Sequence, residues 1–250
     1  MVQKSMGGGI PVLARWISDW DLGMATEFWY IIKDNKFDIA SLKAKRRYEI
    51  NKGKRNFDVS LIDPTQYIDQ LLYVQEEALK SYPLKYRPKN IDYNQYISEL
   101  HSKWDFIYGA FLRETGELVG YAFLNDQKDF VEFQVLKVIP SYEKLGVNAA
   151  IIVKILEDLE GRFDGKFYIV DGARNISHET KFQDYLEKYF GFRKAYCKLN
   201  IKYRPSIIPI VKILYPIRKQ LKKFDRNSMI HQVNGVLFME EIARKCNKKR

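Results

Sequence analysis

The sequence predicts an α/β protein built on a mixed β-sheet, and three observations support this prediction. Strand-like and helix-like segments follow one another as helix, strand, helix, three strands, helix, strand, helix, strand. Two of these strands, 104–113 and 118–125, flank the turn 114–117 and are expected to form an antiparallel hairpin. No G-x-G-x-x-G motif follows a strand, which disfavours an ordinary dinucleotide-binding fold.

The elements of the first half are marked by local capping and turn signals. Ser41 is a plausible N-cap and Gly53 a plausible end for the first helix, and Asp63-Pro64 is typical of a helix start. The expected elements are strands at 10–18 and 26–33 around the turn-prone residues 19–23, a helix at 42–53, a strand at 57–62, a helix from 63 to about 80, and a short helix at 93–103.

After the hairpin, the second half of the chain alternates between strands and helices. A strand at 130–139 completes a meander, and its residues 130–138 are expected to be central and buried on both faces around Phe133 and Val135. The remaining expected elements are a helix at 146–160 ended by Gly161, a strand at 166–172, a helix at 177–189, and one or two strands within 190–204.

The composition excludes several classes of protein. The 250 residues are 46% hydrophobic and include 15 Phe and 17 Tyr, so most of the chain can bury a core and is not disordered. Two Cys and three His form neither a disulfide scaffold nor a recognisable zinc site, so no metal is expected. No apolar run reaches the roughly 18 residues of a membrane span, and no signal peptide is recognised. We therefore expect a soluble protein of the cytoplasm.

The net charge of +11 is concentrated in two segments. Residues 43–55 hold seven Lys and Arg against one Glu, and residues 202–250 hold thirteen against three acids, so the remainder is slightly acidic. Localised positive charge attracts partners that carry phosphate, such as nucleic acid, lipid headgroups or a nucleotide-like cofactor. The alternative is that these side chains belong to solvated helix faces.

The C-terminal segment 205–250 is expected to be a basic helical extension. Within 207–224, apolar residues recur at steps of three and four and share one helix face, with lysines opposite and Pro216 expected to kink the helix. Such a helix can lie on an anionic membrane, as a peripheral contact at the inner face, or it can dock on its own domain. The apolar residues are Ile210, Ile213, Leu214, Ile217, Leu221 and Phe224.

The stretch 130–156 carries the strongest functional signal, because a strand runs through Pro140 into a short turn and then into an apolar helix near Gly146. The free N–H groups of a helix N-terminus form a site for phosphate or pyrophosphate, and a glycine there lets an anion approach the backbone. The alternative is an ordinary strand–turn–helix unit without a ligand.

The same stretch resembles the acetyl-CoA pyrophosphate motif of GNAT acyltransferases. The matching residues are Val138, Pro140, Tyr142, Gly146, Ala150, Ile151 and Ile152. Where the family has Arg/Gln-x-x-Gly-x-Gly/Ala, this chain has Glu143 in place of the first residue and Asn148 in place of the second Gly. The resemblance implies a mostly antiparallel central sheet flanked by helices, and an acetyl-CoA or other acyl-CoA donor. The donor would be bound by Leu136, Val138, Glu143, Lys144, Leu145, Gly146, Val147, Asn148 and Ala149.

A second resemblance spans residues 37–204 and concerns the second GNAT unit of Fem-type transferases, which use aminoacyl-tRNA to build peptidoglycan cross-bridges. Its residues are Arg46, Arg47, Ile50, Lys52 and Val59, with Val170-Asp171-Gly172 and Phe190-Gly191 further on. The first GNAT unit of that family is absent. This resemblance implies aminoacyl-tRNA as an alternative donor, with tRNA as a partner of the basic segment.

Candidate site residues follow from the chemistry of acyl transfer, which needs a base for the amine and an acid for the leaving group. Glu132 is the candidate base, and by the two-residue period it should share a face with Gln134, Leu136 and Val138. The resemblance implies Tyr185 or Tyr189 as the acid, although each can also be core packing. The substrate-binding candidates are Arg46, Arg47, Asp171 and Arg174, and His178 is a weaker candidate base.

Together these observations predict an N-acyltransferase that moves an acyl or aminoacyl group onto a small amine acceptor, such as an amino sugar or a cell-envelope precursor. The alternative is a GNAT-like module that has lost catalysis and binds a phosphate-rich ligand, nucleic acid or a membrane surface. The expected organisation is N-terminal strands in 1–36, the transferase domain in 37–204 and the extension in 205–250.

Overall fold

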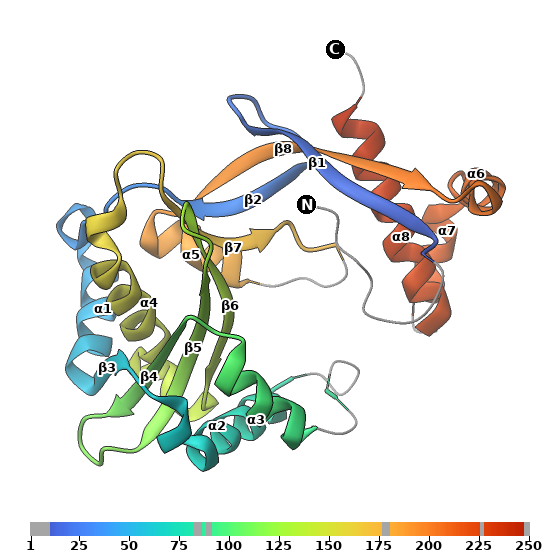
Figure 1. Ribbon diagram of the computed structural model, residues 1–250. Helices are drawn as coiled ribbons and strands as arrows, with labels where there is room; N and C mark the ends of the chain where they lie inside the picture. The colour runs from blue at the N-terminus through green and yellow to red at the C-terminus, as the bar shows by residue number, and fades with distance from the viewer. Residues whose placement is uncertain (1–10, 83–86, 89–91, 177–180, 226–227, 248–250) are drawn as a thin grey trace. The chain divides into compact units, whose positions relative to one another are not determined.

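The computed structural model describes residues 11–82, 87–88, 92–176, 181–225 and 228–247. Its contacts divide the chain into two compact units. The terminal unit comprises Met1–Ile31, Ala173–Gln183 and Arg193–Arg250, and the larger unit comprises Ile32–Gly172 and Asp184–Phe192. The expected fold class is confirmed, because helices flank a mixed and mostly antiparallel sheet (Figure 1).

Among its described residues, the larger unit contains five strands in the spatial order β7-β6-β5-β4-β3. The first four of these strands along the sequence pair antiparallel, including the expected hairpin, and β7 joins β6 in parallel. The strands are β3 (Phe57–Leu61), β4 (Phe106–Leu112), β5 (Leu118–Asp126), β6 (Phe130–Val138) and β7 (Tyr168–Ala173), whose last residue belongs to the terminal unit.

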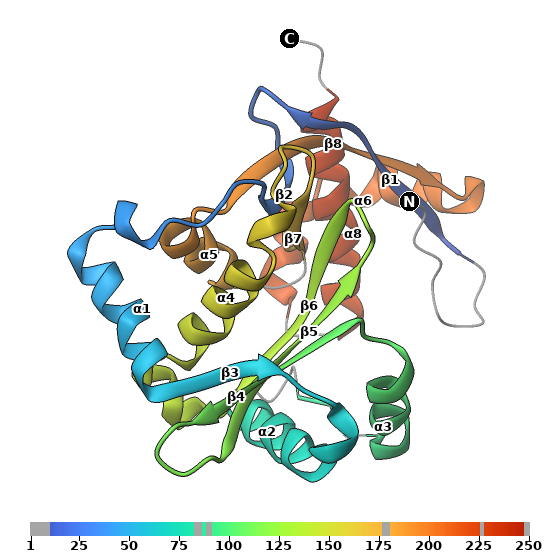
Figure 2. The same ribbon diagram turned by 60° about the vertical axis from the view of Figure 1, so that its left-hand side comes forward.

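Helices cover both faces of this sheet (Figures 1 and 2). One face packs against α4 (Val147–Asp158), which in turn packs against α1 (Ala44–Asn56). The opposite face packs against α2 (Ile68–Lys80), whose Gln75 accepts a 2.7 Å hydrogen bond from Tyr121 of β5. Short 3-10 turns lie at 39–41, 64–66, 140–145 and 160–162, and the remaining helices are α3 (Tyr93–Ser102) and α5 (Phe182–Phe190).

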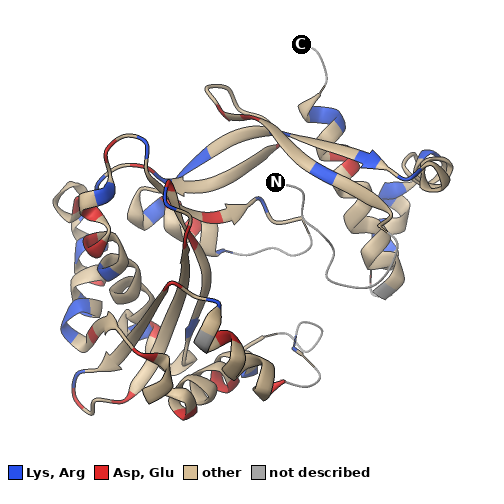
Figure 3. Cartoon of the chain, in the orientation of Figure 1, with Lys and Arg blue, Asp and Glu red and all other residues tan. Residues whose placement is uncertain are grey.

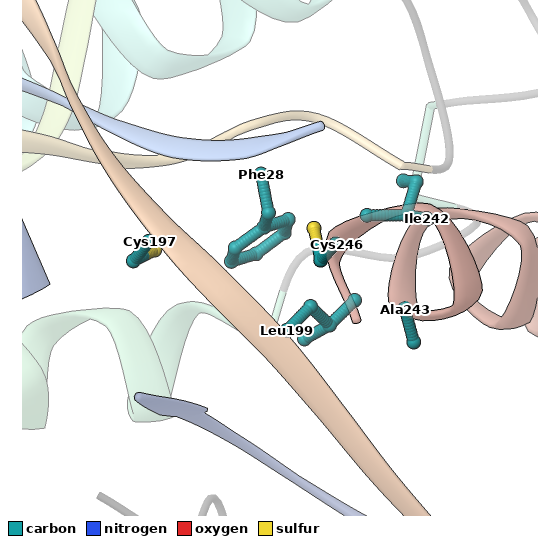
Figure 4. Packing of buried hydrophobic residues seen from close by; sticks show 6 residues of the cluster. All are labelled: Phe28, Cys197, Leu199, Ile242, Ala243 and Cys246. Atoms are coloured by element: carbon teal, nitrogen blue, oxygen red, sulfur yellow. The ribbon is translucent and has the colours of Figure 1, made fainter. Parts of the chain in front are cut away.

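The terminal unit contains the antiparallel strands β1 (Leu13–Leu22) and β8 (Arg193–Tyr203), followed in spatial order by β2 (Phe28–Lys33). The long helix α8 (Ser228–Cys246) packs its apolar side on β8. Figure 4 shows this core, which is formed by Phe28, Cys197, Leu199, Ile242, Ala243 and Cys246. Helix α8 lies within the segment 205–250, which the sequence predicted to be helical.

Three local expectations are wrong, and each fails because of packing or backbone geometry. The first helix begins at Ala44 without a side-chain cap and continues past Gly53 to Asn56, while Ser41 ends a separate 3-10 turn. Strand β1 extends through the expected turn to Leu22, with Asp19 and Asp21 at positive φ.

The third concerns segment 207–224, which is not one kinked helix. It breaks into α6 (Ile208–Leu214), a turn around Pro216 and α7 (Arg218–Leu221), with 3-10 turns at 205–207 and 222–224. Proline removes a backbone donor and clashes with the preceding turn, so the α-helical ladder stops there.

Candidate functional site

A β-bulge at Gln134 divides the central strand β6. Phe123 pairs with Val135, but the next residue of β5, Leu124, pairs with Phe133, so Gln134 is the extra residue. Cross-strand partners point to the same face, and Gly120, the partner of Val138, lies against Ile151 of α4. Val138 and Leu136 therefore face α4. Strand β6 is central, as expected. It is not buried on both faces, however, because Gln134 is exposed and Val135 is half-buried.

The bulge also changes the position of Glu132. Its partner Asn125 is an odd number of residues from Gly120, so Glu132 lies on the opposite face from Leu136 and Val138, on the side of α2. The expected common face is wrong, because one inserted residue reverses the alternation. Glu132 is half-buried and accepts a 2.7 Å hydrogen bond from Gln134 Nε2.

Strands β6 and β7 separate directly after Glu132. Their parallel pairing covers Phe130–Glu132 against Tyr168–Val170, and in the described residues it goes no further. The remaining residues of β6, up to Val138, therefore leave one backbone edge unpaired by β7. Strand edges present N–H and C=O groups that an extended ligand can bind by adding to the sheet.

The N-terminus of α4 follows this open edge. The chain passes through the 3-10 turn 140–145 to Gly146, which has φ +92° and is the N-cap of α4. The first α-helical hydrogen bond runs from Ala150 N to Gly146 O at 3.0 Å. The N–H groups of Val147, Asn148 and Ala149 precede it, and such groups have no acceptor inside their own helix. These three residues thus present free backbone N–H groups at the start of α4.

Helix α1 packs unusually closely on this N-terminus. A Cβ atom on Gly53 would lie less than 3.0 Å from the carbonyl oxygen of Gly146 and 3.2 Å from Ala150 N. Lys52 Nζ donates to Lys144 O at 2.8 Å, and Asn56 Nδ2 donates to Leu145 O at 3.1 Å. Gly53 is therefore a helix-contact residue rather than a helix end, and α1 fixes the loop that leads into α4.

Two tyrosines of α5 lie beside this loop. The rings of Tyr185 and Tyr189 are 5.0 Å apart, and burial together with the nearby Tyr189, Glu49 and Glu143 raises the pKa of Tyr185. Burial and a hydrogen bond to Glu49 raise the pKa of Tyr189. Both hydroxyls therefore stay protonated at neutral pH and can donate a proton or a hydrogen bond. Sequence reasoning missed Glu49, which it counted only as the single acid of the basic segment.

The two predicted substrate-binding arginines of the basic segment, Arg46 and Arg47, have partners within the larger unit. Arg46 donates to the carbonyl of Lys188, and its guanidinium lies 5.3 Å from the ring centroid of Tyr189. Arg47 donates to the carbonyls of Ala40 at 3.2 Å and Leu42 at 2.6 Å. The structure therefore gives both arginines a role in fixing the ends of α1 and α5.

The other predicted binding residues fall in different units. Asp171 is half-buried in the larger unit. Arg174 belongs to the terminal unit, where it donates to Glu27 Oε2 at 3.0 Å and lies 4.5 Å from the ring centroid of Trp29. These contacts hold Arg174 within its own unit. His178 lies outside the described residues.

The described residues contain no group of three or more His, Cys, Asp or Glu side chains arranged to hold a metal ion. None of their helices combines the length and the hydropathy that crossing a bilayer requires.

Comparison with known proteins yields similarities of structure. No protein-family model matches the sequence, and neither does any curated protein. Similar solved structures include L-PGS from Bacillus licheniformis, which is 14% identical with a TM-score of 0.49 over 81% of this chain and 66% of its own. A conserved protein of unknown function from Bacteroides thetaiotaomicron is 14% identical with a TM-score of 0.50 over 76% and 62%.

A GCN5-related N-acetyltransferase-like protein from Streptococcus suis is 18% identical, with a TM-score of 0.40 over 71% of this chain and 61% of its own. This chain spans less than two thirds of the length of each of these three proteins. At 14% sequence identity, the similarity to the Bacteroides thetaiotaomicron protein is a similarity of fold.

Proposed function

We propose that the chain is an N-acyltransferase that moves an acyl group from an acyl-CoA onto an amine, such as that of an amino sugar or a cell-envelope precursor. One observation carries the proposal: β6 parts from β7 at Glu132, and its open edge leads to the free N–H groups at the start of α4. This arrangement supports an extended, phosphate-bearing donor with its phosphates at the helix and its chain along the strand.

The residues present fit such a donor. The amides of Val147, Asn148 and Ala149 would hold the pyrophosphate, and Lys144, whose side chain is exposed, would supply a positive charge. The thioester of the bound donor would supply an activated acyl group. Glu143 lies in the turn 140–145 that leads to α4. Its carboxylate would repel additional negative charge and would therefore favour a donor with few phosphates over a longer polyphosphate.

The chain's own groups have distinct roles in the proposed mechanism. Glu132 would take the proton of the attacking amine, directly or through one water molecule. Tyr185 or Tyr189 would donate a proton to the leaving group, since raised pKa values keep both hydroxyls protonated. Helix α1 would act by positioning, because Lys52 and Asn56 bind the carbonyls of Lys144 and Leu145 and so fix the turn that leads into α4.

Titration calorimetry with acetyl-CoA tests the donor. Asn148→Asp places a carboxylate at the second residue of α4, where it suits the helix dipole but repels a pyrophosphate. We expect acetyl-CoA to bind about tenfold more weakly to this variant. The matched control is Asn94→Asp, the same change at the second residue of α3, which should leave the affinity unchanged. Equal affinity in both variants, or no binding to the wild type, would refute the proposed donor site.

Turnover with a panel of amines tests the chemistry. Glu132→Gln should lower kcat by roughly 10²–10⁴-fold while acetyl-CoA affinity stays the same. The control Glu114→Gln alters an exposed turn residue and should leave kcat unchanged. Donor binding without turnover on any amine would favour the alternative of a binding module that has lost catalysis.

Aminoacyl-tRNA is the alternative donor, and the exposed lysines Lys43 and Lys45 on α1 favour it. If α1 binds tRNA, Arg46→Glu/Arg47→Glu should weaken binding and flatten its dependence on salt, by about one unit of slope for each lost phosphate contact. Parallel salt slopes for the variant and the wild type would exclude α1 from the donor site.

A further inference from the structure

The segment 207–224 of the terminal unit presents an apolar side to solvent. Ile210 and Ile213 are three residues apart within α6 and therefore share one side of that helix, and Ile217 and Phe224 belong to the turns that follow. The exposed fractions are 50% for Ile210, 70% for Ile213, 39% for Ile217 and 62% for Phe224.

This apolar side is exposed although the segment is firmly attached. Val211 is buried, and Leu214 and Leu221 are half-buried. Arg218 Nε donates to Glu241 of α8 at 2.9 Å, and Asn234 of α8 donates to Leu221 O at 3.3 Å. The exposed apolar residues are therefore those of the segment that do not pack against α8.

The same segment also carries exposed lysines. Lys212, Lys219, Lys222 and Lys223 are exposed, and within the described residues none of them forms an ion pair. The acid that follows them, Asp225, accepts hydrogen bonds from His231 and Asn234. Figure 3 shows Lys and Arg along the end of β8 and the short helices after it. The segment thus has docked residues, exposed apolar residues and exposed lysines.

We infer that this segment is a docking surface for an anionic lipid bilayer. Exposed isoleucine and phenylalanine side chains can enter the boundary between headgroups and acyl chains, and the flexible lysines of the same segment can reach lipid phosphates. Charge complementarity selects a negatively charged surface, because four exposed lysines lack acidic partners in the described chain. The inference concerns the terminal unit and does not depend on the proposed transferase activity.

Co-sedimentation of the full chain with vesicles tests this inference. The vesicles are phosphatidylcholine alone, or phosphatidylcholine with a quarter phosphatidylglycerol. The wild type should bind the anionic vesicles, bind the neutral ones much more weakly, and lose part of its affinity at high salt. Free inorganic phosphate should not compete with the vesicles, because the exposed apolar side chains can be buried only in a bilayer.

Two variants and their controls make the test specific. Ile213→Ser should weaken binding to anionic vesicles about tenfold, and Lys219→Glu/Lys223→Glu about 20-fold. The matched controls are Leu61→Ser, an exposed apolar residue of β3, and Lys45→Glu/Lys166→Glu, two exposed lysines of the larger unit. Both controls should bind vesicles like the wild type.

Three results would overturn the inference. The first is an absence of binding to anionic vesicles. The second is equal weakening in variants and controls, which would show diffuse charge attraction. The third is concentration-dependent self-association in sedimentation velocity that Ile213→Ser abolishes without any vesicle binding, which would show that a second copy covers this face. Unchanged thermal unfolding would confirm that the surface variants fold.

Discussion

Replacing Gly53 with Ala should destabilise the protein, although alanine is the better helix former. Gly53 lies within α1, and an added Cβ would lie less than 3.0 Å from the backbone oxygen of Gly146. Neither backbone can yield without separating α1 from α4. Forcing extra volume into a packed contact costs about 1–3 kcal/mol, and the upper part of this range, about 2–3 kcal/mol, applies here because the atom in the way belongs to the backbone. The gain in helix propensity is about 1 kcal/mol. We therefore expect a net loss of about 1–2 kcal/mol.

The matched control is Gly235→Ala in the middle of α8, where an added Cβ has no atom within 4 Å. This variant should gain up to about 1 kcal/mol from helix propensity alone. The difference between the two variants then measures the contact between α1 and α4, because the propensity term is common to both.

Differential scanning calorimetry is the assay. For a chain of this size, about 1 kcal/mol corresponds to roughly 2–4 °C in Tm, so Gly53→Ala should lower the Tm by about 2–8 °C. Gly235→Ala should leave the Tm unchanged or raise it. A Gly53→Ala protein that is as stable as the wild type or more so would refute the close approach of α1 to α4.

Three further predictions follow from single contacts. Arg162 binds both carboxylate oxygens of Asp126, at 2.6 and 2.9 Å, and lowers the pKa of Asp126, so Arg162→Ala should cost about 0.5–1 kcal/mol at pH 7. This advantage of the wild type should disappear in urea titrations as the pH falls through the lowered pKa, since a protonated Asp126 gains nothing from the pair. Tyr185→Phe should lower turnover by roughly 10²–10⁴-fold across the accessible pH range with an unchanged Tm if Tyr185 is the proton donor, because its raised pKa keeps the hydroxyl protonated throughout, whereas a purely structural role would lower the Tm. Burial raises the pKa of Cys197 to about 12, so iodoacetamide at pH 8 should label Cys197 only after unfolding, and labelling of the native protein, read by peptide mass, would contradict its burial.

Local signals in the sequence determined the elements and their order. The hairpin 104–125, the strand 130–138 and the start of a helix at Gly146 were all predicted within a few residues. Asp63 caps the turn that leads into α2, as Asp-Pro indicated. These features depend on residues that are neighbours in the chain, so periodicity, turn chemistry and capping are sufficient to reveal them.

Only the tertiary structure decided how the candidate site is built. The alternation of apolar and polar residues in β6 is interrupted at Val135-Leu136, but only the pairing with β5 shows the bulge that moves Glu132 to the other face. Gly53 has the appearance of a helix end, and its role becomes visible only when α1 meets Gly146, far along the chain. Likewise, the apolar pattern of 207–224 does not show where the helix breaks or which residues dock on α8. The periodicity of a sequence shows how the residues of one element alternate between its faces. Which elements pack together is decided by contacts between segments that are distant in sequence.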